Sequence, residues 1–472
     1  MSKRLITKLA ILGVAVMAAT WLVTAPVYVR PSDLPPGMAE AAPQRCIGVF
    51  IICMALWFTN LIPLAATGLL AIAMLPLLGI LPKEEAFSLF GNSAVFFMLG
   101  VFLLAAAMIS TGLSKRVTLV VLHRFGKNPT RLVIGVTVSA AFLSLWMPEH
   151  AVAAMIFPII TEIVASLKLE RGAPYAKKLF LGLAWGSIIG GVGTFLGGSR
   201  APLALEMLHK AHPDARISFL SWMLAAAPIV VVMTAVAVFM LTRRLPNELD
   251  DIKGATSMLD ERVRRLGPMS GREVRLAGLT LVTIVFWIST GTTIGLGVIA
   301  IVAATALFVL RIVEWKDVQG YVNWGVLIMY GGAVALGAAL AETKAMEWLA
   351  HEVISDSFPP LALMMIMATV AIVLTEGISN AAAVAILLPI GYSLGEMTGV
   401  GPIMMTLCVT VASGLAFLLP ISSPPNAISF SAGHYSVREV VQFGWPMTVC
   451  ALIVMYAVIA VWWNMVLHIN TW

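Results

Sequence analysis

The chain has 472 residues, of which 60% are hydrophobic and only 11% charged, and its mean hydropathy is +0.95. This composition excludes a soluble enzyme and is typical of a polytopic helical membrane protein. The long uncharged runs do not alternate between apolar and polar residues, which excludes a β-barrel. The formal charge of +6 is spread over loops, so it indicates cytoplasmic loops and no nucleic-acid partner.

Residues 5–24 are predicted to form an uncleaved first span, because about 20 apolar residues follow Lys3 and Arg4. This span places the N-terminus in the cytoplasm. Residues 25–45 contain five prolines and mixed charge, which predicts an external loop. The next expected elements are two crossings within residues 46–81 that separate near 60–63, a short external loop at 83–85, and a span over 91–112.

Two segments with opposite charge are expected on the two membrane surfaces. Residues 114–131 carry basic side chains among Val, Leu and Phe, which predicts an amphipathic helix on the cytoplasmic side. Residues 342–356 hold four acidic side chains and one lysine, and we expect an amphipathic helix on the external side. Two repeats of inverted topology would produce such a pair.

A short repeat relates the two halves of the chain. The stretch AVAAMIFPI at 151–159 matches AAVAILLPI at 382–390, with Pro158 and Pro389 in register. Just before the second copy, TEGISN at 375–380 interrupts an apolar run with polar side chains. Unpaired polar groups are costly in hydrocarbon, so we predict half-helices that meet at a polar tip and offer free N–H groups to an anion.

Each copy of the repeat is therefore assigned to a re-entrant hairpin followed by a broken helix. The hairpins are expected at 132–166 and 361–394, and the broken helices at 179–208 and 402–431. With the remaining spans, the prediction is an all-α inverted repeat of about 11 spans whose C-terminus is external. The remaining elements are a span at 219–241, a hydrophilic cytoplasmic connector at 243–275 with a short surface helix, two short crossings in 276–310 that turn at 289–293, and spans at 322–340 and 440–467.

These stretches resemble the divalent-anion:sodium symporter family, which includes the sodium/dicarboxylate and sodium/sulfate carriers. The resemblance rests on four motifs in the family's order: SNA at 379–381, AAVAILLPI, LPISSPPNAISFSAG at 419–433, and GSIIGGVGTFLGG at 186–198. It implies a homodimeric secondary transporter in a bacterial inner membrane that works by an elevator mechanism. Its scaffold would comprise residues 1–130 and 276–356, its moving transport part 131–243 and 357–472, and its connector 244–275.

The sequence departs from the family's motifs mainly in its first half. The family's Ser-Asn-Thr becomes Ser379, Asn380 and Ala381 at the second hairpin tip, but Pro148, Glu149 and His150 at the first. The family's Thr-Pro-Pro-Asn remains in the second broken helix as Ser423, Pro424, Pro425 and Asn426, but becomes Gly198, Ser199, Arg200 and Ala201 in the first. The predicted substrate-binding residues are Glu149, His150, Ser199, Arg200, Asn380, Ala381, Ser423, Pro424 and Asn426.

The resemblance also places a sodium ion at the second hairpin, with oxygen ligands from Thr375, Asn380 and the backbone near Ile378 and Ser422. Glu376 is expected to brace its hairpin by accepting N–H bonds. At the first half-site, Arg200 either replaces a second sodium and pairs with Glu149, or binds the anion while Glu149 or His150 takes a proton.

The function predicted is secondary transport of a small divalent anion, of the dicarboxylate or sulfate class. Sodium is the expected coupling ion, with a proton as the alternative, and no cofactor is expected. Two alternatives within transport are a proton-linked antiporter, in which Glu149, His150 and Glu376 form a relay, and an anion exchanger. An intramembrane enzyme is an alternative of another class, but the sequence has no G-x-S-x-G or H-E-x-x-H motif. The expected partners are the anion, membrane lipid and a second copy of the chain.

Overall fold

The computed structural model describes residues 3–24, 40–243, 249, 251–345 and 359–467. Every regular element in these ranges is a helix. Eight of the described helices are long and apolar enough to cross a membrane, and shorter apolar helices of 10–17 residues accompany them. The prediction of an all-α polytopic membrane protein is confirmed, while the number of crossings stays a prediction.

The first half of the chain and the hydrophilic connector form the following elements within the described residues. They are α1 (Lys3–Thr24), α2 (Ala42–Thr59), α3 (Leu64–Leu77), α4 (Lys83–Ser88), the 3-10 helix η2 (Leu89–Gly91), α5 (Ser93–Ser110), α6 (Leu113–Phe125), α7 (Pro129–Ser144), α8 (Glu149–Ser166), α9 (Pro174–Gly191), α10 (Arg200–Ala211), α11 (Phe219–Arg243) and α12 (Lys253–Leu266).

The second half follows a similar order. It consists of α13 (Gly271–Ile294), α14 (Leu296–Val309), α15 (Trp315–Val318), the 3-10 helix η3 (Gln319–Tyr321), α16 (Trp324–Glu342), α18 (Pro360–Thr375), α19 (Asn380–Thr398), α20 (Pro402–Ala412), α21 (Pro424–Ser431), α22 (Val437–Ala457) and the π-helix η4 (Val458–Val466).

Two helical hairpins occupy the predicted places. Helices α7 and α8 are joined by residues 145–148, and α18 and α19 by residues 376–379. Both α7 and α18 have only 16 residues, which is short of the roughly 20 that a bilayer core needs. The helix starts are encoded locally, since Asn128 caps α7 and Ser379 accepts the Ala382 N–H to cap α19.

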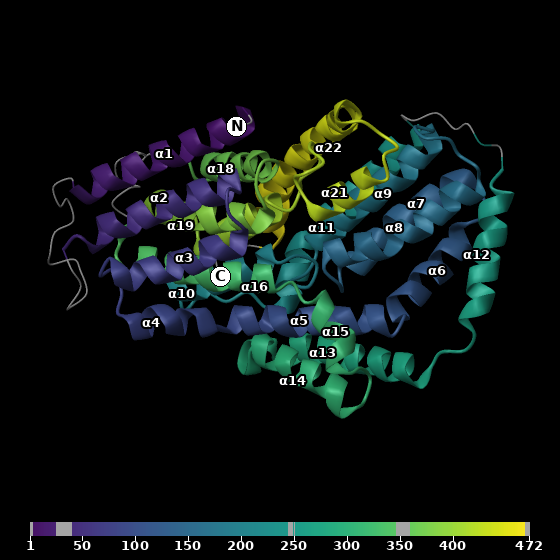
Figure 1. The fold of residues 1–472 in the computed structure, drawn as a ribbon, viewed down its shortest axis with the longest axis horizontal. Helices are drawn as coiled ribbons and strands as arrows, with labels where there is room; N and C mark the ends of the chain where they lie inside the picture. The colour runs from purple at the N-terminus through teal and green to yellow at the C-terminus, as the bar shows by residue number, and fades with distance from the viewer. Residues whose placement is uncertain (1–2, 25–39, 244–248, 250, 346–358, 468–472) are drawn as a thin grey trace.

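The two halves interlock through their broken helices. Helix α21 of the second half packs on α8 and α9 of the first, while α10 of the first packs on α19 and α20 of the second. Figure 1 shows α21 beside α9 in the upper part of the molecule. The breaks themselves, at residues 192–199 and 413–423, are in contact, since a Cβ atom at Gly414 would overlap the Val192 side chain.

The other long helices pair through small residues. Helix α3 crosses α16 where Gly68 and Gly332 bring the two backbones into contact, and a side chain at Gly332 would overlap the Gly68 backbone. Helix α5 crosses α14 at Gly100, where a Cβ atom would lie 2.7 Å from Ala300. Close contacts of this kind stabilise membrane helix pairs, because lipid leaves little hydrophobic driving force between helices.

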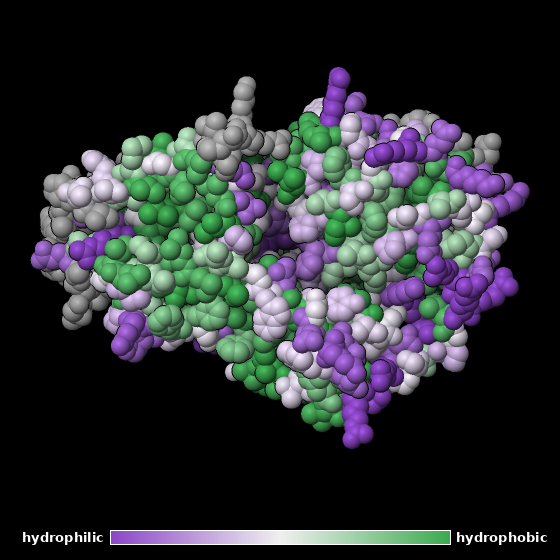
Figure 2. Space-filling model, viewed as in Figure 1, coloured by the Kyte–Doolittle hydropathy of each residue, from purple (hydrophilic) through white to green (hydrophobic). Residues whose placement is uncertain are grey.

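The hydrophilic end of the molecule is formed by α6 and α12, which pack together. In Figure 1 they lie at the right-hand end, and Figure 2 shows hydrophilic residues gathered there while hydrophobic residues cover much of the opposite half. Figure 2 also shows a hollow near the middle of this face. The short surface helix predicted in the connector is α12, and it packs on the basic amphipathic helix α6.

Several predicted boundaries differ from the structure. Residues 83–85 begin the short helix α4 and are not a loop, and α2 already begins at Ala42, inside the predicted external loop. The amphipathic helix predicted over 114–131 ends at Phe125, because Pro129 starts a new helix that Asn128 caps. Most of the acidic segment predicted over 342–356 lies outside the described residues.

The turn predicted at 289–293 was also wrong. Helix α13 continues through these hydroxyl residues to Ile294, and the chain turns at Gly295, whose φ of +93° favours glycine. The hydroxyls do not break the helix because Ser289 donates to the Val285 carbonyl (2.7 Å) and Thr290 to the Phe286 carbonyl (2.9 Å).

Candidate functional site

The tip of the second hairpin is braced by a buried carboxylate. Glu376 Oε1 accepts the backbone N–H groups of Phe417 (2.8 Å) and Leu418 (2.9 Å), and Oε2 accepts that of Leu419 (3.0 Å). These three residues lie in the break between α20 and α21. The expectation that Glu376 accepts N–H bonds is confirmed, and its bonds tie the hairpin to the second broken helix.

Asn380 begins α19 at the same tip. Its Oδ1 accepts a hydrogen bond of 2.7 Å from the Thr375 hydroxyl, while its amide N–H groups donate to no described residue. Oxygens of Thr375 and Asn380 and the carbonyls nearby are hard donors of the kind that bind alkali and alkaline-earth cations. The donor set thus fits the predicted sodium ion, and the free amide N–H groups suit an anion.

Asn426 and Ser423, both predicted to bind the substrate, differ in whether their polar atoms are already hydrogen-bonded. The Asn426 amide donates to the Ala416 carbonyl and to the Ser422 hydroxyl, both at 3.0 Å. Asn426 therefore holds the break in shape and has no amide donor left for an anion. The Ser423 hydroxyl is buried and makes no hydrogen bond to the described residues, so it remains available, whereas Pro424 beside it is exposed.

The first half-site contains a buried ion pair. Arg200 Nη1, on the first residue of α10, lies 3.2 Å from Glu149 Oε2, on the first residue of α8, and the residues are 2% and 5% exposed. The Glu149 N–H donates to the Gly197 carbonyl at 2.8 Å, which joins the hairpin tip to the first break. Arg200 Nη2 has no hydrogen-bond partner among the described residues.

Three glycines make room for this ion pair. A Cβ atom at Gly198 would lie 2.5 Å from Arg200 Nη1, and one at Gly414 would lie 2.5 Å from Arg200 Nε. A Cβ atom at Gly191 would overlap Glu149 Oε2. Because Gly414 follows α20, the guanidinium of the first half lies against the break of the second half. This contact between sequence-distant segments could not be predicted from the sequence.

Tyr330, on α16, also contacts the first half-site. Its side chain is fully buried, and its hydroxyl lies near Ser199 and the Glu149–Arg200 pair but makes no hydrogen bond to the described residues. The sequence signal for this residue is weak: a single tyrosine precedes the Gly- and Ala-rich stretch GGAVALGAALA.

His150 faces away from Glu149, although the two residues are adjacent in sequence. Its ring packs edge-on against Phe102 at 6.2 Å and lines a cavity of about 520 Å³ together with Tyr321 and Trp324. No hydrogen bond joins it to Glu149 or Glu376 within the described residues, so the carboxylate–imidazole relay lacks its central contact in this structure. Ala381, which was predicted to bind the substrate, is buried in the first turn of α19, and Ile378 lies in the hairpin turn.

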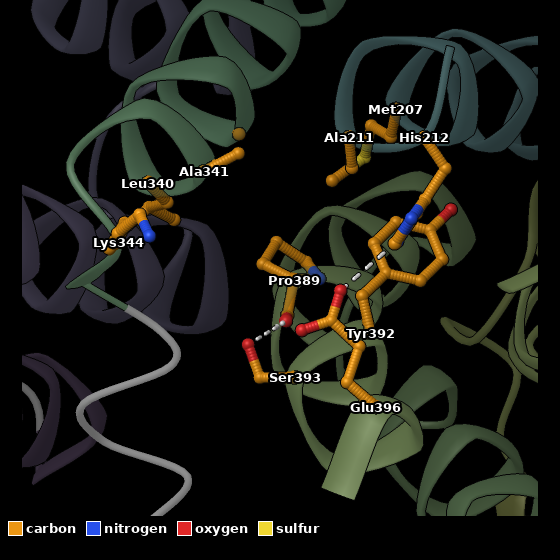
Figure 3. A pocket seen from close by; sticks show the side chains of 11 residues that line it. Met207, Ala211, His212, Leu340, Ala341, Lys344, Pro389, Tyr392, Ser393 and Glu396 are labelled. Atoms are coloured by element: carbon orange, nitrogen blue, oxygen red, sulfur yellow. Dashed lines mark hydrogen bonds and ion pairs between the residues drawn. The ribbon is translucent and has the colours of Figure 1, made fainter. Parts of the chain in front are cut away.

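A separate cavity of about 110 Å³ lies between α16 and α19, and none of the predicted site residues lines it. Figure 3 shows His212 and Glu396 directed toward each other on one wall and Lys344 on the opposite wall. His212 Nε2 lies 4.0 Å from Glu396 Oε1, and its ring packs edge-on against Tyr392 at 5.1 Å. Burial lowers the pKa of His212, and the Glu396 carboxylate only partly offsets this.

Comparison with known proteins gives a consistent family. The model of the sodium:sulfate symporter transmembrane region matches residues 6–469. Two Staphylococcus aureus proteins, the sodium-dependent dicarboxylate transporters SdcS of strains RF122 and USA300, are each 28% identical over 445 residues, which covers 87% of this chain and 85% of theirs. The YdaH transporter of Alcanivorax borkumensis matches in fold with a TM-score of 0.55 and 16% identity, over 89% of this chain and 98% of that one. The resemblance stated from the motifs is thereby confirmed, and the chain belongs to the sodium:sulfate symporter family.

Proposed function

We propose that this protein is a secondary active transporter that moves a small divalent anion, of the dicarboxylate or sulfate class, with sodium across a bacterial inner membrane. The observation that carries this proposal is the intact second half-site. There the Thr375–Asn380 hydrogen bond leaves oxygens for a sodium ion, and the Asn380 amide and Ser423 hydroxyl remain free for an anion. Family membership supports the substrate class, since the SdcS relatives are sodium-dependent dicarboxylate transporters.

Helix dipoles add to the attraction for the anion. Helices α19 and α21 both begin at this half-site, at Asn380 and Pro424, and the N-terminal end of a helix carries roughly half a positive charge. The first two residues of α21, Pro424 and Pro425, carry no N–H, and no side chain accepts the N–H of Asn426 that follows them. An anion seated between the two helix starts is therefore stabilised by backbone groups that need no bulky cationic side chain.

The proposed movement is of the elevator type in a homodimer. The hairpins and broken helices of both halves interlock through α8, α9 and α21 and through α10, α19 and α20, which supports their moving as one body. The pairs α3–α16 and α5–α14 would form the stationary scaffold. We also infer a cytoplasmic N-terminus and an external C-terminus from the charge distribution.

At the first half-site, the Glu149–Arg200 ion pair would replace one sodium ion of the cycle. A guanidinium stays protonated, and two unit charges ~4 Å apart at an effective dielectric of ~20 interact by about 4 kcal/mol. A sodium ion beside Arg200 would lose most of its affinity. Glu149 compensates the fixed charge of Arg200.

A second candidate is the exchange of one anion for another, and the same fixed ion pair favours it. In exchange, the carrier binds an anion for each crossing in either direction, and no net movement of coupling ions is needed. A half-site whose cation is built into the chain meets that requirement better than one whose sodium must bind and leave.

Uptake into liposomes tests the proposal and separates the candidates. Labelled succinate and labelled sulfate are supplied to purified protein with an inward sodium gradient, without sodium, or to liposomes preloaded with the unlabelled anion, at two pH values. Sodium-stimulated uptake of an unaltered anion is expected, and uptake only into preloaded liposomes indicates exchange. Asn380→Ala should abolish either activity while Asn128→Ser, which keeps the cap of α7, retains it. Normal uptake by Asn380→Ala contradicts the assigned site.

A further inference from the structure

A further cavity with polar side chains lies beside α10. It has a volume of about 250 Å³ and is lined by α10, the start of α5, the segment that leads into α11, and the α13–α14 turn. None of the residues assigned to the anion or sodium site lines it. Its chemistry is set by an acidic side chain and a basic one.

The acidic side chain is Glu206 on α10, which is 7% exposed. Its Oε2 accepts a hydrogen bond of 3.1 Å from the Ser93 hydroxyl. Its Oε1 has neither a hydrogen bond nor an ion pair with any described residue, although the side chain lines the cavity. This oxygen is open to the cavity, where a cation or a hydrogen-bond donor can reach it. The cavity therefore favours a ligand with a positively charged donor.

The basic side chain is Arg216, on the opposite segment of the wall. Only Nη1 is used, in a long hydrogen bond of 3.4 Å to the Thr292 carbonyl, which leaves the other N–H groups of the guanidinium for an anion. Helix α14 begins at Leu296 on the same wall, and no side chain caps its N-terminus. Free backbone N–H groups and a guanidinium together suit a phosphate.

The cavity lies where several apolar helices begin or end. Helices α5, α11 and α14 begin at its wall, at Ser93, Phe219 and Leu296, and α13 ends there. Where several long apolar helices begin and end together, the chain leaves the hydrocarbon core. The flanking side chains of Leu220, Ile294 and Val298 are 43%, 47% and 55% exposed, so an apolar surface for acyl chains adjoins the polar cavity.

We propose that this cavity binds the headgroup of an aminophospholipid of the phosphatidylethanolamine type. The primary ammonium donates to Glu206 Oε1, and the phosphate lies against Arg216 and the start of α14. A glycerol headgroup offers Glu206 no cation, and a quaternary choline ammonium has no N–H to donate. Phosphatidylethanolamine is therefore selected by charge and by hydrogen bonding together.

Native mass spectrometry of the purified full chain tests this proposal without a transport readout. Protein in detergent is mixed with equal amounts of phosphatidylethanolamine and phosphatidylglycerol, and the retained lipid is measured. The wild-type chain should retain phosphatidylethanolamine preferentially. Glu206→Gln should weaken that retention roughly tenfold, since the ammonium then meets a neutral amide oxygen in place of a charged carboxylate. The matched control Glu396→Gln, at an exposed acid elsewhere, should retain the preference.

Results of this mass-spectrometry measurement, and of a separate thermal-protection measurement, can overturn the proposal. Equal retention of the two lipids by the wild-type chain, or an unchanged preference in Glu206→Gln, contradicts it. If Glu206→Gln fails to fold, Arg216→Gln at an exposed position must weaken retention of both lipids. Thermal protection by soluble phosphoethanolamine at the concentration where the lipid protects would assign the cavity to a free small molecule and not to a lipid.

Discussion

The Glu149–Arg200 ion pair is the residue-scale feature that distinguishes this chain from the pattern of its family. Both side chains are almost fully buried, so each is the main compensation for the other's charge. A desolvated ion pair adds little net stability compared with apolar residues, but breaking it leaves an uncompensated charge at a cost of ~3–5 kcal/mol. The ion pair should therefore be far more sensitive to single substitutions than to a double one.

We expect Glu149→Gln and Arg200→Ala each to cause a severe loss of uptake and a lower melting temperature. The double variant should recover part of the thermal stability, because no charge is then left without a partner. A double-mutant cycle on thermal unfolding in detergent measures the coupling between the two residues. Additive losses, with the double variant less stable than either single one, would contradict a functional ion pair.

Gly414 gives an independent test of where the guanidinium lies. A methyl group there would overlap the Val192 side chain and sit 2.5 Å from Arg200 Nε and 2.6 Å from Nη2, so Gly414→Ala should displace the guanidinium from Glu149 and reduce uptake strongly. Gly401→Ala is the matched control, since it precedes the same helix α20 and a Cβ atom there meets nothing within 4 Å. Normal uptake by Gly414→Ala would show that Arg200 does not need its present position.

At the scale of elements, the loop between α8 and α9 is tied to the loop between α21 and α22. Arg171 Nε donates to the Gly433 carbonyl at 2.8 Å, and the Gly172 N–H donates to His434 Nδ1 at 3.4 Å. Burial lowers the pKa of His434, and the positive charges of Arg171 and Lys177 lower it further. The ring is therefore neutral when its Nδ1 accepts this hydrogen bond.

This contact predicts a pH-dependent stability. Because the folded-state pKa of His434 lies below the unfolded value of about 6.5, its stabilisation is complete above that value and is lost as the pH falls through the folded-state pKa. Thermal unfolding of the wild-type chain should become easier between pH 7 and pH 5. His434→Asn keeps an acceptor that does not titrate, so its melting temperature should fall less over this range. Parallel slopes for the two proteins would show that His434 is not responsible.

At the scale of elements, the hairpins could be predicted because polar residues interrupt an apolar run in the sequence. The polar residues of TEGISN marked the second hairpin tip, and the repeat transferred it to the first half. The turn at Gly295 was missed because the hydroxyls of Ser289 and Thr290 donate hydrogen bonds to backbone carbonyls of their own helix and do not interrupt it. At the site, opposite charge made a Glu149–Arg200 ion pair one of the two alternatives predicted from the sequence. The different direction of His150 and the contacts of Gly414 and Tyr330 depend on tertiary packing, which a single sequence does not show.

At the scale of the whole molecule, the proposed transporter has one ordinary half-site and one with a built-in cation. Sodium dependence follows from this asymmetry. If only the Thr375–Asn380 side binds sodium, uptake should rise with sodium concentration with a Hill coefficient near one. Initial rates in liposomes measure it. A coefficient well above one, together with normal uptake by Arg200→Ala, would show that both half-sites bind sodium.

The built-in ion pair also has an electrical consequence. The charges of Glu149 and Arg200 cancel each other, so the proposed elevator movement would carry no net charge of theirs through the membrane field. A divalent anion with one sodium ion keeps one negative charge, and moving it into a cell that is negative inside costs about 2.3 kcal/mol per 100 mV. Potassium diffusion potentials in liposomes should therefore slow net uptake when the inside is negative and leave anion exchange unchanged. The voltage of the cell would then hold the carrier near balanced exchange, and net import would depend on a steep sodium gradient.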